Sequence, residues 1–128
     1  MIPAPRLSKR ENAVELLTAS ARAHGPFAVV ALAGELDMTG VSTAERTIRS
    51  ARSDHSPHLV LDLTGLTFMD STGLRVLLQA QRQTTAQQGT LALAAPAPAV
   101  RRVIEVTGLD RHFTIYDTLD EALSASID

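Results

Sequence analysis

The chain has 128 residues, a length that fits one domain able to bury a core without disulfides or metals. Charged residues make up 20% of the sequence and the formal net charge is −2, so neither nucleic acid nor a membrane is an expected partner. Cysteine is absent, which excludes disulfides, thiol catalysis and cysteine-bound metals and fits a cytoplasmic protein. No apolar stretch approaches the roughly 20 residues of a membrane span.

Short apolar runs bounded by turn residues predict the strands. Residues 1–12 combine prolines with basic side chains and predict a flexible arm in front of one domain, 13–128. The expected strands of that domain are 13–20, 27–34, 58–63, 90–95 and 112–116. The first is the weakest, and turn residues at 21–26 are expected to follow it.

Amphipathic segments between these strands predict helices at 41–53, 71–88, 97–108 and 117–126. In the first of these helices, Val41, Ala44, Ile48 and Ala51 form the predicted apolar stripe. Ser42 followed by Glu45 predicts a capping box, Gly89 predicts a left-handed helix end, and Asp117 is the expected cap of the last helix. Strands that alternate with helices indicate the α/β class. We expect a mixed, mainly parallel sheet of four to five strands, packed with about four helices.

Two polar loops, 34–40 and 64–71, follow successive strands, and sites of α/β proteins lie at this end of the sheet. In the second loop Asp70 can cap the following helix alone, which leaves Ser71 free to face solvent. In the first loop Glu35 has the pattern of a solvated side chain. By pattern alone Asp37 has it too, and its removal is then expected to leave the thermal midpoint nearly unchanged.

The helix after Ser71 has a core stripe of Leu74, Leu77 and Leu78. Val76 lies about 160° from the centre of this stripe at 100° per residue, which predicts an exposed side chain one turn from Ser71. Arg75 is also predicted to point away from the core.

Signatures of catalysis and of cofactor binding are missing from the chain. There is no G-x-G-x-x-G motif and no phosphate-binding G-K-[ST] motif, and the four histidines lack the spacing of metal ligands, so no cofactor or metal is expected. Ser71 stands on a strand-to-helix turn like a hydrolase nucleophile, but Met69 occupies the place where that motif has glycine. His112 is the base that a hydrolase would need, and nothing around it supports that role. We therefore expect a binding or modification site and no enzyme.

Three segments carry a family resemblance. They are LAGELD at 32–37, LVLDLTGLTFMDSTGLRVLL at 59–78 and AVRRVIEVTGLDRHFTIYDTLDEAL at 99–123. Together they resemble the STAS domain of bacterial anti-sigma-factor antagonists over roughly residues 27–123. Arg75 stands where some members have glycine, which bears on the choice of partner and leaves the fold unaffected.

The resemblance implies a partner-switching protein that is a monomer when free. Its partner would be an anti-sigma factor that is also a serine kinase, which is bound when the antagonist is unphosphorylated, so that the sigma factor is released. The kinase would phosphorylate Ser71, and a PP2C-type phosphatase would reverse the reaction. The family's docking surface would contain Asp37 beside Ser71. Convergence at the ends of adjacent strands and on the outward face of the next helix extends this expected surface to Asp70, Thr72 and Val76. The alternative is a STAS scaffold or transporter-associated subunit without phospho-switching.

Overall fold

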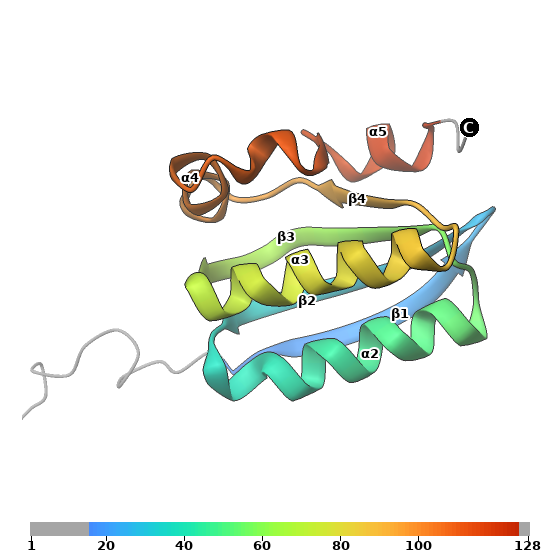
Figure 1. The fold of residues 1–128 in the computed structure, drawn as a ribbon, viewed down its shortest axis with the longest axis horizontal. Helices are drawn as coiled ribbons and strands as arrows, with labels where there is room; N and C mark the ends of the chain where they lie inside the picture. The colour runs from blue at the N-terminus through green and yellow to red at the C-terminus, as the bar shows by residue number, and fades with distance from the viewer. Residues whose placement is uncertain (1–15, 126–128) are drawn as a thin grey trace, which may run out of the picture.

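Residues 16–125 are described by a computed structural model, in which five strands form one sheet (Figure 1). The strands lie in chain order across the sheet: β1 (Thr18–His24), β2 (Phe27–Leu36), β3 (Leu59–Met69), β4 (Leu91–Ala94) and β5 (Thr114–Tyr116). Strands β2 to β5 are parallel, and β1 pairs with β2 in the antiparallel sense. The predicted arm, 1–12, lies outside the described residues.

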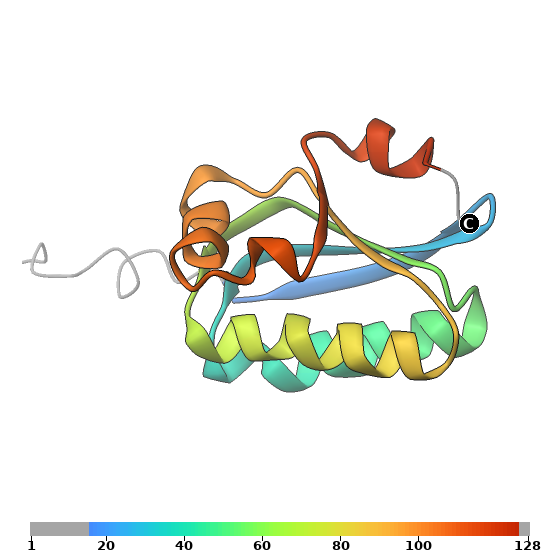
Figure 2. The ribbon, with the colours of Figure 1, turned by 45° about the horizontal axis from the view of Figure 1, so that its top comes forward.

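Helices cover both faces of the sheet: the crossovers between parallel neighbours pack in one core, and the helix that follows the last strand packs on the other side. Helices α2 (Val41–Asp54) and α3 (Ser71–Ala86) lie side by side on the same face, as Figure 2 shows. Helix α4 (Pro98–Val106) packs against β3 and α3, and the short α5 (Leu119–Leu123) lies on the opposite face. The predicted α/β class, with a mixed five-stranded sheet and four helices, is confirmed.

The core is aliphatic, as expected from a sequence without tryptophan. Strand β3 shows why: Leu59, Leu61 and Leu63 point to one side of the sheet, and all three are at most 1% exposed. On α2, the predicted stripe packs onto this side through Ala44, Ile48 and Ala51, each at most 2% exposed. A separate small cluster, which includes Val60, packs under α5 on the other face.

Three predicted helix ends differ from the structure. Helix α2 begins at Val41 with Gly40 before it, so Ser42 lies inside the first turn, exposed, and caps nothing. After α3 the left-handed residue is Gln88, at φ 63°, and Gly89 is needed for space, since a Cβ there would be 2.0 Å from the carbonyl oxygen of Pro57.

At the start of α5, the side chain of Thr118 accepts the hydrogen bond from the N–H of Glu121 and is the cap. Asp117, the predicted cap, forms an ion pair with Arg101 at 2.9 Å instead. At the other end of the chain, the strand predicted at 13–20 and the turn predicted at 21–26 are misplaced. Residues 13–15 lie outside the described residues, and β1 runs from Thr18 to His24, because this segment pairs with β2 and the turn begins only at Gly25. No helix among the described residues is long and apolar enough to cross a membrane.

Candidate functional site

The ends of β2 and β3 bring the predicted site residues together at the carboxyl edge of the sheet. Leu36, the last residue of β2, is the register partner of Met69, the last residue of β3. Neighbouring strands are about 4.8 Å apart, so Asp37 and Asp70 leave the sheet side by side. Ser71 then begins α3 at the same edge. The convergence predicted from the order of strands and loops is therefore found.

At the start of α3, Asp70 caps the helix and Ser71 faces solvent. Asp70 has an extended backbone, and its Oδ1 accepts a hydrogen bond of 3.1 Å from the N–H of Gly73. Ser71 is exposed, and its hydroxyl has no hydrogen-bond partner within residues 16–125. The predicted cap and the predicted solvent-facing hydroxyl are both confirmed, while phosphorylation of Ser71 stays a prediction.

Asp37 makes a different use of its carboxylate. Only 6% of the residue is exposed, and its Oδ1 accepts hydrogen bonds from the backbone N–H of Thr39 at 3.0 Å and from the Thr39 hydroxyl at 2.7 Å. These bonds hold a short 3-10 turn, Met38–Gly40, in front of α2. The expectation of a solvated loop acid is wrong, because the chain needs an acceptor to close this turn.

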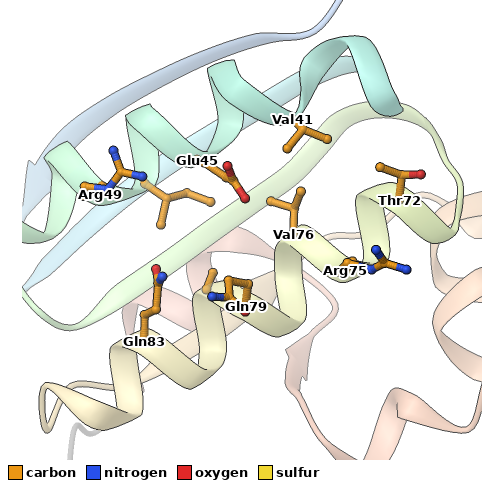
Figure 3. A pocket seen from close by; sticks show the side chains of 10 residues that line it. Val41, Glu45, Arg49, Thr72, Arg75, Val76, Gln79 and Gln83 are labelled. Atoms are coloured by element: carbon orange, nitrogen blue, oxygen red, sulfur yellow. The ribbon is translucent and has the colours of Figure 1, made fainter.

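Two further predictions of exposure are wrong for reasons of packing. Glu35 belongs to β2 and is 5% exposed. Val76 is 4% exposed, because α2 lies beside α3 and covers the flank of α3 that faces away from the sheet stripe. Figure 3 shows Val76 pointing toward α2, with Thr72 one turn before it. Arg75 is exposed as predicted.

Exposed apolar side chains at the same edge were missed by the sequence reasoning. Met38 is 76% exposed, next to Asp37, and Phe68 is 38% exposed, two residues before Asp70. Leu16, 69% exposed, precedes Leu17, whose side chain would touch a Cβ at Gly40. The available signal was an apolar residue inside a polar loop. Apolar side chains left in water around a polar centre are typical of a protein-binding surface.

In the described part of the chain, His112, the base that a hydrolase would need, is far from Ser71 along α3. His112 lies beside α3 at Gln81, whose side-chain amide donates to the His112 carbonyl. Gln81 is ten residues along the helix from Ser71, which corresponds to roughly 15 Å at 1.5 Å per residue. Among residues 16–125, no group of three His, Asp or Glu side chains could hold a metal ion. The base that the hydrolase alternative names is therefore not beside Ser71.

Comparisons with known proteins agree with this fold. The family model of the STAS domain matches residues 18–122. The anti-sigma-F factor antagonist RsfB of Mycobacterium tuberculosis is 30% identical over 113 residues, which are 88% of this chain and 92% of RsfB. The crystal structure of an anti-sigma factor antagonist from Mycobacterium paratuberculosis is 34% identical, with a TM-score of 0.79, and the match covers 99% of this chain and 100% of that one.

A third relative is the anti-sigma factor antagonist SpoIIAA in its unphosphorylated form, 28% identical with a TM-score of 0.70, over 83% of this chain and 93% of SpoIIAA. The phosphorylated form of SpoIIAA, from Bacillus, is 27% identical with a TM-score of 0.65, over 83% of this chain and 96% of that one. The chain therefore belongs to the STAS domain family, and its curated relatives are anti-sigma factor antagonists.

Proposed function

We propose that this protein is an anti-sigma-factor antagonist that binds an anti-sigma factor while Ser71 is free and loses it when Ser71 is phosphorylated. The anti-sigma factor is itself the serine kinase, a PP2C-type phosphatase restores the hydroxyl, and the exchange takes place in the cytoplasm. The protein is a substrate and a binding partner and not an enzyme. The observation that carries the proposal is the exposed Ser71 hydroxyl, left without an internal partner because Asp70 caps α3. SpoIIAA, known in both forms, supports it.

The position of Ser71 favours a modification that leaves the fold intact. Ser71 is the first residue of α3, where N–H groups and the helix dipole stabilise an anion by about 0.3 to 1 kcal/mol at an exposed site. Arg75 lies one turn further along the same helix, and residues four apart on a helix are neighbours. A phosphate on Ser71 is thus tolerated by its own helix, and the modified domain stays folded.

The same phosphate disfavours a partner. It carries a charge of about −2 and stands next to Asp70 and near Asp37. At about 8 Å and an effective dielectric of about 40, a phosphate and one carboxylate repel by about 2 kcal/mol. A partner acid that accepts the free Ser71 hydroxyl would meet the same repulsion, and the phosphate also fills the space that the partner surface occupies. A few kcal/mol is a factor of tens to hundreds in affinity.

Affinity measurements with purified candidate kinase anti-sigma factors test the proposal. We expect the Ser71 form to bind, the phosphorylated form to bind roughly 30-fold more weakly, and Ser71→Asp to lie between them. Ser71→Ala should bind and resist the kinase. The matched control is Thr72→Ala, which removes the neighbouring hydroxyl and should still be phosphorylated. Equal affinity of the free and phosphorylated forms would end the proposal.

Two rivals predict other results. A STAS scaffold or transporter-associated subunit without phospho-switching would carry no phosphate on Ser71 in cells, which mass spectrometry of the isolated protein would show. A serine hydrolase would turn over ester substrates and lose this activity with Ser71→Ala. The proposed antagonist is a monomer when free, and sedimentation of the unphosphorylated protein tests that point.

A further inference from the structure

A groove of about 400 Å³ runs between α2 and α3 on the face of the domain that these helices form (Figure 3). It begins at Thr72, the residue after Ser71, and extends to Gln83 near the end of α3. Both helices start at the carboxyl edge of the sheet, so the groove opens directly beside the Ser71 site. A partner seated on Ser71 can therefore continue into the groove without leaving the surface.

The floor of the groove is apolar. Val41 of α2 and Val76 of α3 point toward each other at the end near Ser71. Ile48 and Ala80, further along α2 and α3, also line the groove. Three of these four side chains are at most 4% exposed, and Val41 is half-buried. Apolar side chains at the bottom of an open groove suit the apolar stripe of a helix from another protein.

The rim of the groove is positive. Arg49 on α2 and Arg75 on α3 line it, and neither guanidinium has a hydrogen-bond or ion-pair partner among the described residues. Glu45 is the acid of the rim, and it forms no ion pair with either Arg. In sequence, the two helices carry five Arg against Glu45 and Asp54.

A third cation lies beneath the far end of the groove. Arg52 is 9% exposed and donates to the Gln83 side-chain oxygen at 3.0 Å and to the Thr84 hydroxyl at 3.3 Å. Its Nε has no partner, and within residues 16–125 no carboxylate pairs with it. Burial, and then the nearby charge of Arg49, lower the pKa of Arg52. A buried charge without a counter-ion is costly, and an acid brought into the groove would reduce that cost.

From the apolar floor and the unpaired cations we infer that the groove between α2 and α3 binds an acidic amphipathic segment of the partner protein. Its apolar side chains would lie on Val41, Ile48 and Val76, and its carboxylates would lie between Arg49 and Arg75 and toward Arg52. The inference rests on the proposed function for the identity of that partner, the anti-sigma factor. The groove would add affinity that does not depend on the Ser71 hydroxyl.

A designed peptide pair tests the groove without the natural partner. One peptide of about 15 residues has Leu at helical i, i+3, i+4, i+7 spacing and Glu beside the stripe, and the other has Lys in place of Glu. Titration of the full-length, isotope-labelled chain is followed by NMR. We expect the amide signals of Val76 and Ala80 to shift with the Glu peptide, and the Glu peptide to bind roughly fivefold or more tightly than the Lys peptide.

The decisive variant is Arg49→Glu/Arg75→Glu, which reverses the rim and should reverse the preference between the peptides. The matched control is Arg102→Glu/Arg111→Glu, which changes the net charge equally at exposed positions on α4 and beyond it and should change affinity less than about twofold. Binding of neither peptide, equal binding of both, or an equal effect of the two double variants would overturn the inference.

Two other occupants of the groove would change the NMR signals under different conditions, and either result would overturn the inference. If the Val76 and Ala80 signals shift when the free chain is concentrated, the groove binds a second copy. If they shift when residues 1–12 are deleted, the arm occupies it.

The same variants separate the groove from the proposed function. With the anti-sigma factor, Arg49→Glu/Arg75→Glu should lower affinity roughly tenfold or more and Arg102→Glu/Arg111→Glu by less than about twofold. An anti-sigma factor that leaves on Ser71 phosphorylation but binds Arg49→Glu/Arg75→Glu like wild type would overturn the groove alone. An anti-sigma factor whose affinity falls with Arg49→Glu/Arg75→Glu but not with phosphorylation of Ser71 would overturn the proposed switch and leave the groove inference standing.

Discussion

Two neighbouring turns of this domain share the pattern Asp-x-Thr-Gly and have different structures. After β2 the chain reads Asp-Met-Thr-Gly from Asp37, and after β3 it reads Asp-Ser-Thr-Gly from Asp70. Each Asp has an extended backbone at the end of its strand, and the two strand ends are register partners. Each turn leads into one of the paired helices α2 and α3. The two turns differ in the donors from which each carboxylate accepts hydrogen bonds.

Asp37 bonds twice to Thr39 and holds a 3-10 turn, and it is buried. Asp70 bonds once, to the N–H of Gly73, and the α-helix begins directly. Met38, which follows the first Asp, thus presents an exposed thioether on a 3-10 turn. Ser71, which follows the second Asp, presents an exposed hydroxyl on an α-helix. One pattern thus supplies a buried anchor in one turn and an exposed hydroxyl in the next.

The largest effect should come from the contact between the two turns, which is at Gly73. A Cβ on Gly73 would stand 2.6 Å from the Leu36 carbonyl oxygen, at the end of β2. Because backbone cannot give way cheaply, we expect Gly73→Ala to lower the free energy of unfolding by about 2 to 3 kcal/mol in urea denaturation. The counterpart, Gly40→Ala, meets the Leu17 side chain at 2.9 Å and should cost less. The reverse order would contradict the assignment of the contact.

The two carboxylates should differ next. Asp37→Ala removes the charged acceptor of two hydrogen bonds from Thr39, and we expect a loss of about 2 kcal/mol in unfolding free energy. Asp70→Ala removes one cap and should cost about 1 kcal/mol. Asp37→Asn keeps an acceptor oxygen and should recover part of the loss. An Asp37→Ala protein with an unchanged thermal midpoint would restore the solvated reading of this residue and remove the distinction between the turns.

Met38 should affect binding and not folding. With 76% of the residue exposed, Met38→Ser should change the free energy of unfolding by less than about 0.5 kcal/mol. If Met38 is an anchor beside Ser71, affinity for the anti-sigma factor should fall roughly fivefold. Val106, 69% exposed on α4, provides the control, and Val106→Ser should bind like wild type. Equal binding of both variants would place the docking surface away from the first turn.

The smallest effect should come from Ser42, just after the first turn. Because Gly40 precedes α2 and Ser42 caps nothing, Ser42→Ala should change the free energy of unfolding by less than about 0.5 kcal/mol. Thr118→Ala, which removes an observed cap from α5, should cost about 1 kcal/mol. Thermal unfolding of the pair decides this, and a Ser42→Ala loss as large as that of Thr118→Ala would restore the capping box.

The parts predicted from sequence are those that depend on local pattern. Period and turn residues identified the four helices and strands β2 to β5, and the position of Ser71 at a strand-to-helix junction followed from the same signals. They misplaced β1, whose residues 21–24 have the composition of a turn and are strand because they pair with β2. The apolar stripe of α2 was predicted correctly because one stripe faces one sheet. The number and order of the elements therefore needed no tertiary information.

The errors concern residues whose environment comes from distant parts of the chain. Val76 is buried by α2, a neighbour that a helical wheel of α3 does not contain. Glycine is required at position 89 because the carbonyl oxygen of Pro57, 32 residues earlier, leaves no room for a Cβ, and not because of a positive φ. Asp37 was assigned to solvent because a loop acid usually is, whereas here its oxygen closes a turn. The groove was missed for the same reason, since it exists only where two helices meet.

The helical setting of Ser71 has a consequence for the pool of molecules that the proposed kinase can modify. The hydroxyl is presented by the first turn of a folded helix, tied to the sheet through Asp70 and Gly73. A peptide of residues 67–80 is too short to form this helix alone and should be a far poorer substrate than the domain. The proposed kinase would then phosphorylate only folded antagonist molecules. Misfolded chains would be neither phosphorylated nor able to bind the partner. Misfolding would therefore lower the total amount of functional antagonist without changing the fraction of it that is phosphorylated.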